Sequence, residues 1–186
     1  RSAVVRTPVG ILVIEHAQVF ALLADPRLRS SLLDFVKIQG LVEGPIFDAV
    51  ATSILAVDGD DHTRVRKLVS RAFTPRSVER LRPSMRALAR EISGAFVPAG
   101  RCEFMADFAD HYPIQLICEL LGVPKKDHEQ FGRWSNAITW VLSLELMAHL
   151  DEVVDGFTGL ASYVEAFIEE RRARPEDDLV TALIQA

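Results

Sequence analysis

Two side chains that donate hydrogen bonds, His62 and Arg66, stand four residues apart in the segment 62–73. On an α-helix this spacing places them on the same side, one turn apart. An imidazole and a guanidinium in this arrangement form a two-point donor site for anionic oxygens. Val69 and Phe73 are neighbours on the same helix, so the site suits carboxylates carried by a large apolar ligand. Taken alone, such a pair is more often a solvated helix edge.

The pair belongs to a strongly basic segment, residues 62–90, in a chain that is otherwise acidic. The segment has nine Lys or Arg and one acid, Glu79, and it leaves 12 bases and 25 acids in the rest of the chain. Such a surface can dock an acidic protein, bind nucleic acid or simply be solvated. The sequence lacks a helix-turn-helix spacing with a small residue and Gly at the turn, which argues against nucleic acid.

We expect His62 and Arg66 to lie on a helix over about 62–73. The carboxylates of Asp58–Asp61 can cap its N-terminus. Thr74-Pro75 and Arg82-Pro83 are both typical of helix starts, so we expect the chain to restart as a helix at each proline. A long loop is expected over 40–61, because three glycines and a proline interrupt scattered apolar residues there.

The remaining periodicity predicts a mainly α fold with one small β-hairpin near the N-terminus. The expected elements are a hairpin of 3–6 and 11–14, a helix from His16 to Leu23, a helix from Met85 to Phe96, a weak strand over 101–106, a buried helix from about Phe108 to Leu121, and helices over 125–144, 150–174 and from Leu179 onward. Asp177-Asp178 caps the last helix. No repeat or composition shift marks a boundary, so residues 1–186 are predicted to be part of a single domain.

Composition excludes several protein classes. The 186 residues are 49% apolar and 25% charged, which suits a globular core. Cys102 and Cys118 lack metal-site spacing and are predicted to be structural in a reducing, cytoplasmic environment. The longest apolar stretch, 138–150, is too short to span a membrane. The histidines other than His62 have no partner at metal-ligand spacing, which predicts surface or capping roles.

The residues around His62 and Arg66 resemble helix C of the bacterial cytochrome P450s. The run DGDDHTRVRKLVSRAFTPR, 58–76, is similar to the family's D-P-P-E-H-T-R-L-R and the basic and apolar run that follows it and ends in F-T-P. Three further blocks occur in the family's order and resemble its B, E and H helices: VFALLADPRL (19–28), FADHYPIQLICELLGVP (108–124) and DDLVTA (177–182). The resemblance covers essentially the whole chain.

This resemblance implies a cofactor site and part of a substrate pocket. His62 and Arg66 match the residues that hold the propionates of haem b. Ser53-Ile54-Leu55 matches the end of a loop that lies over the haem and shapes the pocket for an apolar small-molecule substrate. The intact enzyme is then expected to be a haem-thiolate monooxygenase that inserts one oxygen atom of O₂ into that substrate.

The resemblance also implies roles for two other surfaces. Trp134 and Ile138 match a helix that lines the substrate channel, although an apolar pocket wall and an apolar core look alike in a sequence. Lys67 and Arg71 match an exposed helix surface that receives a ferredoxin-type electron donor. Solvation remains the simpler interpretation of each basic residue by itself.

Several features of the family do not occur in the sequence. The chain lacks the acid and threonine of the long I helix, the Glu-x-x-Arg pair, and the loop whose cysteine thiolate binds iron. We therefore expect the N-terminal portion of a P450, truncated before the I helix and the haem-thiolate loop and inactive by itself. Gly59 and Asp60 replace two usual prolines and Asp61 replaces Glu, which allows a looser helix start.

Two alternatives from other classes stay open. One is a non-enzymatic helical ligand-binding or regulatory protein. The other is a nucleic-acid-binding helical domain that uses the basic segment 62–90.

Overall fold

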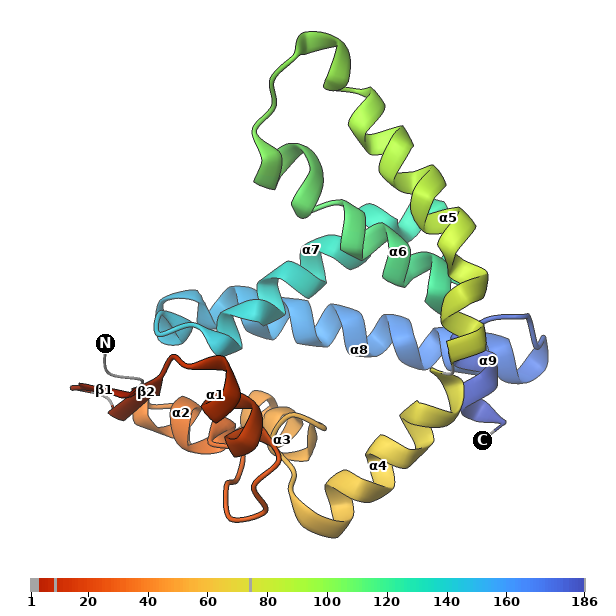
Figure 1. Cartoon of the computed structure of the whole chain (residues 1–186). Coiled ribbons are helices and arrows are strands. Elements are labelled where there is room, and N and C mark those ends of the chain that lie inside the picture. Colours follow the sequence, from red (N-terminus) through yellow and green to blue (C-terminus); the bar gives the residue numbers. More distant parts are fainter. Residues whose placement is uncertain (1–3, 9, 74, 186) are drawn as a thin grey trace. The chain divides into compact units, whose positions relative to one another are not determined.

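The computed structural model describes residues 4–8, 10–73 and 75–185, and among these the side chains of 71, 72 and 75–78 are not described. Contacts divide the chain into two compact units, Arg1–Ser31 and Leu32–Ala186. Helices make up most of the described chain, and a two-stranded antiparallel sheet lies in the first unit (Figure 1). The predicted mainly α fold with a small hairpin near the N-terminus is confirmed.

The first unit contains the hairpin and one helix. β1 (Val4–Thr7) and β2 (Gly10–Val13) pair antiparallel, with Val4 opposite Val13 and Thr7 opposite Gly10. Gly10 has a φ of 145°, which side chains rarely allow, and its carbonyl accepts a hydrogen bond from the Thr7 hydroxyl at 3.0 Å. α1 (His16–Leu23) follows. Both elements match the prediction, except that Ala3 lies outside the described residues.

The second unit begins with α2 (Leu32–Ile38) and α3 (Pro45–Thr52). The prediction of a continuous loop over 40–61 is therefore wrong. Gly44, with a φ of 100°, turns the chain so that Pro45 takes the first helical position, where a proline costs no hydrogen bond. Ile46 and Val50, which look scattered in the sequence, are one turn apart and both buried.

Two helices carry the basic segment, α4 (Gly59–Ala72) and α5 (Pro75–Gly94). The helix predicted over 62–73 is confirmed, with its start three residues earlier. The predicted restart at Pro83 is wrong, because Pro83 lies inside the continuous α5. An interior proline removes one backbone hydrogen bond, and the packing of α5 on α6 (Tyr112–Leu121) keeps the helix continuous.

The predicted strand over 101–106 is also wrong. A 3₁₀ turn, η1 (Val97–Ala99), leads into an irregular stretch and then a π-helical turn, η2 (Met105–Ala109). Phe104, Phe108 and Tyr112 recur every four residues, and their rings stack with centroids 5.3 and 5.2 Å apart. This ladder needs helical spacing, which a strand does not provide.

The rest of the second unit is arranged around α8 (Leu150–Ala173), with α7 (His128–Ile138) packed along it (Figure 1). The short turns are η3 (Lys125–Asp127), η4 (Thr139–Leu142) and η5 (Leu146–His149), and the last helix is α9 (Leu179–Ile184). The helix predicted over 125–144 therefore ends early, at Ile138. The predictions for α8 and α9 are confirmed in place. The helix predicted from Phe108 begins later, as α6 at Tyr112, and Cys118 is its one buried residue.

Two clusters of buried side chains form the core of the second unit. The first joins α2 and α3 to the start of α8 and consists of Val36, Leu41, Ile46, Val50, Val141, Leu146 and Val153. The second joins α6 to α7 and consists of Cys118, Val123 and Phe131.

A buried ion pair connects the ends of three helices. Arg171 near the end of α8 and Asp178 at the start of α9 are 4% and 5% exposed, and Arg171 Nε donates to Asp178 Oδ2 at 2.5 Å. Arg171 Nη2 also donates to the carbonyl oxygen of Gly122, at the end of α6, at 3.1 Å. Asp178 in turn accepts from the backbone N–H of Thr181 at 2.8 Å and caps α9.

Gly122 fits this junction for two reasons. Its φ of 80° lies in the left-handed region, and a Cβ at this position would overlap the Asp178 carboxylate. We expect Gly122→Ala to lower the free energy of unfolding of the intact protein by about 3 kcal/mol or more. Gly100→Ala is the matched control, because Gly100 has a φ of 66° and open space around its Cβ, so it should cost only about 1 kcal/mol. Equal shifts in the urea midpoint would contradict the steric role of Gly122.

Asp178 should also make stability depend on pH. Burial raises the pKa of Asp178, but hydrogen bonds from Arg171 and Thr181 lower it by more, so the pKa lies below its ordinary value. A carboxyl with a depressed pKa stabilises the fold above the pKa of the unfolded state, and that contribution is lost as the pH falls through the folded pKa.

Asp178→Asn should therefore cost about 1.5 to 3 kcal/mol at neutral pH, because Arg171 loses its closest carboxylate but keeps its ion pair with Glu176 at 3.2 Å. The difference from the wild type should narrow as the pH is lowered below about 4. Urea denaturation at several pH values measures this. Glu169→Gln, in an exposed pair with Arg172, should change stability by less than about 1 kcal/mol. A pH-independent difference for Asp178→Asn would rule out the linkage.

Candidate functional site

The structure places His62 and Arg66 one turn apart on α4, as the spacing predicts. His62 is half-buried and Arg66 is exposed. Within the described part of the chain, neither side chain forms a hydrogen bond or an ion pair. The two donors are therefore available to a ligand, and together they can bind two anionic oxygens.

The start of α4 is acidic. Asp58 occupies the N-cap position, and Asp60 and Asp61 lie in the first turn, where carboxylates interact favourably with the helix dipole. Arg64 forms an ion pair with Asp61 at 3.8 Å, with both side chains exposed. Among the described residues, none of these acids forms an ion pair with Arg66.

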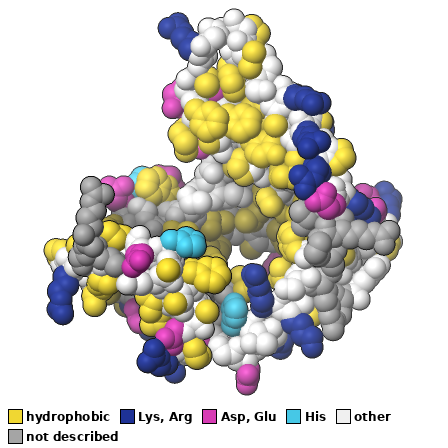
Figure 2. Space-filling view, viewed as in Figure 1, with side chains coloured by type: hydrophobic (Ala, Val, Ile, Leu, Met, Phe, Trp, Pro, Cys, Tyr) yellow, Lys and Arg dark blue, Asp and Glu magenta, His cyan; other side chains and the backbone are white. Residues whose placement is uncertain are grey.

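The predicted partner surface is also on α4, on another side of the helix. Lys67 is exposed and lies one residue beyond Arg66, about 100° further around the helix. Arg71 belongs to the same helix, one turn after Lys67, but its side chain is outside those described. The basic segment continues on α5, where Figure 2 shows dark blue side chains in a row along the helix.

Ser53-Ile54-Leu55 forms the turn after α3. The Ser53 hydroxyl donates to the carbonyl of Val50 at 2.8 Å, and the Ser53 carbonyl accepts from the N–H of Ala56. Ser53 is thus engaged in ending the helix. Ile54 is half-buried, whereas Leu55 is 61% exposed. Of the three, Leu55 offers the largest apolar surface to a ligand.

Trp134 and Ile138 lie on the side of α7 that packs against α8. A Cβ at Gly159 of α8 would overlap the indole of Trp134, and a Cβ at Gly156 would be 3.5 Å from Ile138 Cγ1. The Trp134 ring also lies 6.0 Å from the ring of Tyr163. Both side chains therefore pack in a tight helix interface, and both are half-buried. Their contact with a substrate stays a prediction.

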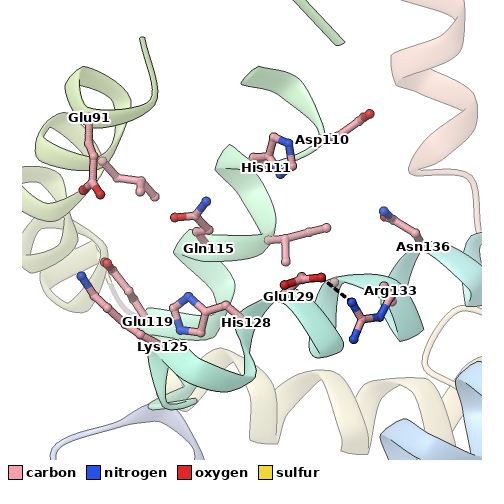
Figure 3. Close-up of a pocket in the computed structure, with 13 residues that line it drawn as sticks. Glu91, Asp110, His111, Gln115, Glu119, Lys125, His128, Glu129, Arg133 and Asn136 are labelled. Carbon is pink, nitrogen blue, oxygen red and sulfur yellow. Dashed lines mark hydrogen bonds and ion pairs between the residues drawn. The ribbon is translucent and has the colours of Figure 1, made fainter. Parts of the chain in front are cut away.

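A cleft with a volume of about 450 Å³ lies elsewhere, between α5, α6 and α7. Figure 3 shows its polar side chains, including His111, Gln115 and His128, and the ion pair of Glu129 with Arg133 at 2.5 Å. His128 Nε2 is 2.9 Å from the carbonyl oxygen of Val123, consistent with a capping role. None of the predicted site residues with described side chains lines this cleft.

An apolar groove of about 350 Å³ lies on the other side of α7, beside α8 and α9. Its lining includes Phe131, Tyr163, Phe167 and Leu183. The sequence has no signal that separates such a groove from core packing. Neither cavity shows a set of groups suited to metal chemistry: among the described residues, no three His, Cys, Asp or Glu side chains converge on a possible metal position.

Comparisons with known proteins identify the family. No protein-family model matches the chain. Luteothin monooxygenase of Streptomyces thioluteus is 33% identical over 189 residues, which cover 100% of this chain and 46% of that protein. The polyketide biosynthesis cytochrome P450 PksS of Bacillus subtilis is 33% identical over 178 residues, 94% of this chain and 43% of its own length.

Solved structures agree with these relatives. The open cytochrome P450 EryK from S. erythraea is 32% identical and superposes with a TM-score of 0.71, over 98% of this chain and 45% of that one. CalO2 is 27% identical and has a TM-score of 0.83; the match covers 99% of this chain and 47% of CalO2.

The chain belongs to the cytochrome P450 family.

The P450 chain spans less than half the length of the relatives it matches. Of its two cysteines, only Cys118 has the burial expected of a structural residue: it is fully buried, and burial raises the pKa of its thiol to about 11. Cys102 is exposed, and it lies in an irregular stretch and not on the predicted strand. Among the described helices, none has the length and apolar composition that crossing a bilayer requires.

Two substitutions test whether Trp134 stabilises the fold by packing, while the exposed Leu55 does not. Trp134→Ala should destabilise the intact P450 by about 3 to 5 kcal/mol, because it empties the interface of α7 with α8. Leu55→Ala, at an exposed position, should change stability by less than about 0.5 kcal/mol. Thermal unfolding measures both. If Trp134→Ala left the melting temperature unchanged, the packing role would be wrong.

Proposed function

We propose that the intact protein containing this chain is a haem-dependent monooxygenase that inserts one oxygen atom of O₂ into an apolar small molecule. Family membership supports the reaction class: similar proteins are named luteothin monooxygenase, mycinamicin IV hydroxylase/epoxidase and steroid C26-monooxygenase. The observation in this chain that carries the proposal is the pair His62 and Arg66, whose donors have no partner among the described residues.

His62 and Arg66 fit the carboxylates of a haem. Propionates are anionic oxygen acceptors on a large apolar ring, and the pair offers an imidazole and a guanidinium one turn apart. The half-buried position of His62 favours a hydrogen bond, because less water competes there. When bound, the haem supplies the iron at which O₂ is activated. In this arrangement the chain's own residues hold and orient the cofactor.

The iron ligand is expected outside this chain. Cys118 is buried in α6 and Cys102 is on an exposed irregular stretch, and neither sequence context resembles the family's cysteine loop. We therefore propose that residues 1–186 by themselves do not catalyse the reaction.

Substrate and partner are also part of this proposal. Leu55, and to a lesser extent Ile54, would contact an apolar substrate, and Ser53 would fix the turn that presents them. Trp134 and Ile138 would act on the substrate pocket through the position of α7, because both side chains pack against α8. Lys67 and Arg71 on α4 would receive a ferredoxin-type electron donor. A cytoplasmic location is the corresponding expectation.

Substitution of the pair tests the cofactor assignment. In the intact protein, His62→Ala combined with Arg66→Ala should speed the transfer of haem to an apoprotein acceptor by about 10- to 100-fold, since charged hydrogen bonds are each worth about 1.5 to 3 kcal/mol and are partly replaced by water. Haem binding should persist, because burial of the ring contributes on the order of 10 kcal/mol.

The matched control is Arg64→Ala with Lys67→Ala, which removes two bases from other sides of the same helix. This variant should lose haem at the wild-type rate. If both double variants lost haem at the wild-type rate, His62 and Arg66 would not be the propionate contacts.

A further inference from the structure

Three arginines form a row on the outer side of α5. Arg82, Arg86 and Arg90 recur every four residues, so they lie on one side of the helix. All three are exposed, and they belong to the helix along which dark blue side chains stand in a row in Figure 2. Arg82 forms an ion pair with Glu79, and its Nε donates a hydrogen bond of 2.9 Å to Glu79 Oε2. Among the described residues, no acid forms an ion pair with Arg86 or Arg90.

The opposite side of α5 is fixed to the protein. Leu88 is 5% exposed, and the carbonyl oxygen of Met85 accepts a hydrogen bond from the Tyr112 hydroxyl of α6 at 3.3 Å. At 100° per residue, Arg86 and Arg90 lie about 100° to 160° around the helix from Met85 and Leu88, whereas Arg82 lies only about 60° from Met85. The helix therefore presents the arginines to solvent on a backbone that does not need to order upon binding.

We propose that the Arg82–Arg86–Arg90 row is a docking surface for an acidic helix of a protein partner. The row is about 12 Å long at the backbone, the length of two helical turns. A partner helix with carboxylates four residues apart has the same repeat, and each guanidinium can bind one carboxylate through two hydrogen bonds. Exposed pairs are worth at most about 1 kcal/mol each, so the row mainly speeds and orients the encounter.

The charge distribution favours a protein over a nucleic acid. Duplex binding draws on many contacts between basic side chains and phosphates, whereas this row has three bases, and one of them is paired with Glu79. Beyond segment 62–90 the chain has 25 acids and 12 bases, which would repel a long polyanion. A short acidic patch on a small protein is the matching partner. This surface lies on α5 and goes beyond the electron-donor surface proposed on α4, so either one can fail without the other.

The test uses the intact protein and a fluorescently labelled apo acyl carrier protein, a small acidic helical protein, as the probe. Fluorescence anisotropy at about 20 mM and about 200 mM salt gives the affinity and its dependence on screening. The wild type should bind the probe with a Kd below about 1 mM at low salt, and the affinity should fall as salt is added. Absence of binding at low salt overturns the proposal.

Variants locate the surface. Arg86→Glu with Arg90→Glu should weaken binding at low salt by about tenfold or more, because attraction becomes repulsion. Lys125→Glu with Lys126→Glu makes the same change of net charge at two other exposed positions and should weaken binding by less than about twofold. Arg86→Lys with Arg90→Lys should retain most of the affinity. Circular dichroism checks that each variant is folded, and Arg86→Gln with Arg90→Gln replaces the reversal if it is not.

Two results would overturn the assignment. Equal losses for the α5 and the Lys125/Lys126 variants would mean that only net charge matters. Tighter binding of a 20-base-pair DNA duplex than of the carrier protein, abolished by the α5 substitutions, would make the row a nucleic-acid surface.

Discussion

The buried pair of Arg171 and Asp178 joins the ends of three helices of the second unit, α6, α8 and α9. Removing two charges from water is costly, so the pair is favourable only with both partners and their hydrogen bonds in place. Those bonds reach the end of α6 through the Gly122 carbonyl and the start of α9 through Thr181. α9 in turn packs against α4, and Asp177, next to Asp178, forms an ion pair with Arg80 of α5 at 3.5 Å. The helix that presents His62 and Arg66 is thus positioned partly from the opposite end of the chain.

Local signals in the sequence predict the elements that local forces decide. The hairpin follows from its turn residues, and α8 and α9 follow from periodicity and from an acid at the cap position. The failures have tertiary causes. Pro83 reads as a helix start, but packing of α5 against α6 keeps the helix continuous through it. The loop expected over 40–61 contains α3, because Ile46 and Val50 find a core whose other members are distant in the sequence.

The candidate site shows the same division. The placement of His62 and Arg66 on one side of a helix depends on spacing alone, and the structure agrees with it. The surroundings of Trp134 and Ile138 could not be predicted, because a pocket wall and a core have the same composition. In the sequence, Arg171 can be recognised only as a basic residue that interacts favourably with the dipole at the end of a helix. Asp178 can be recognised only as a helix cap. Their pairing, and its contact with Gly122, 49 residues earlier, needs the folded chain.

The glycines of α8 have a further consequence for how this sequence can change. A Cβ at Gly156 would be a tight 3.0 Å from Ala137 and from the backbone of Trp134, and at Gly159 the space is occupied by the indole of Trp134. Even a methyl group there would push the two helices apart unless the indole were replaced by a smaller side chain. Positions 134 and 159 therefore depend on each other, because the total volume of their two side chains is constrained. In related sequences, a larger side chain at position 159 should occur together with a smaller one at position 134.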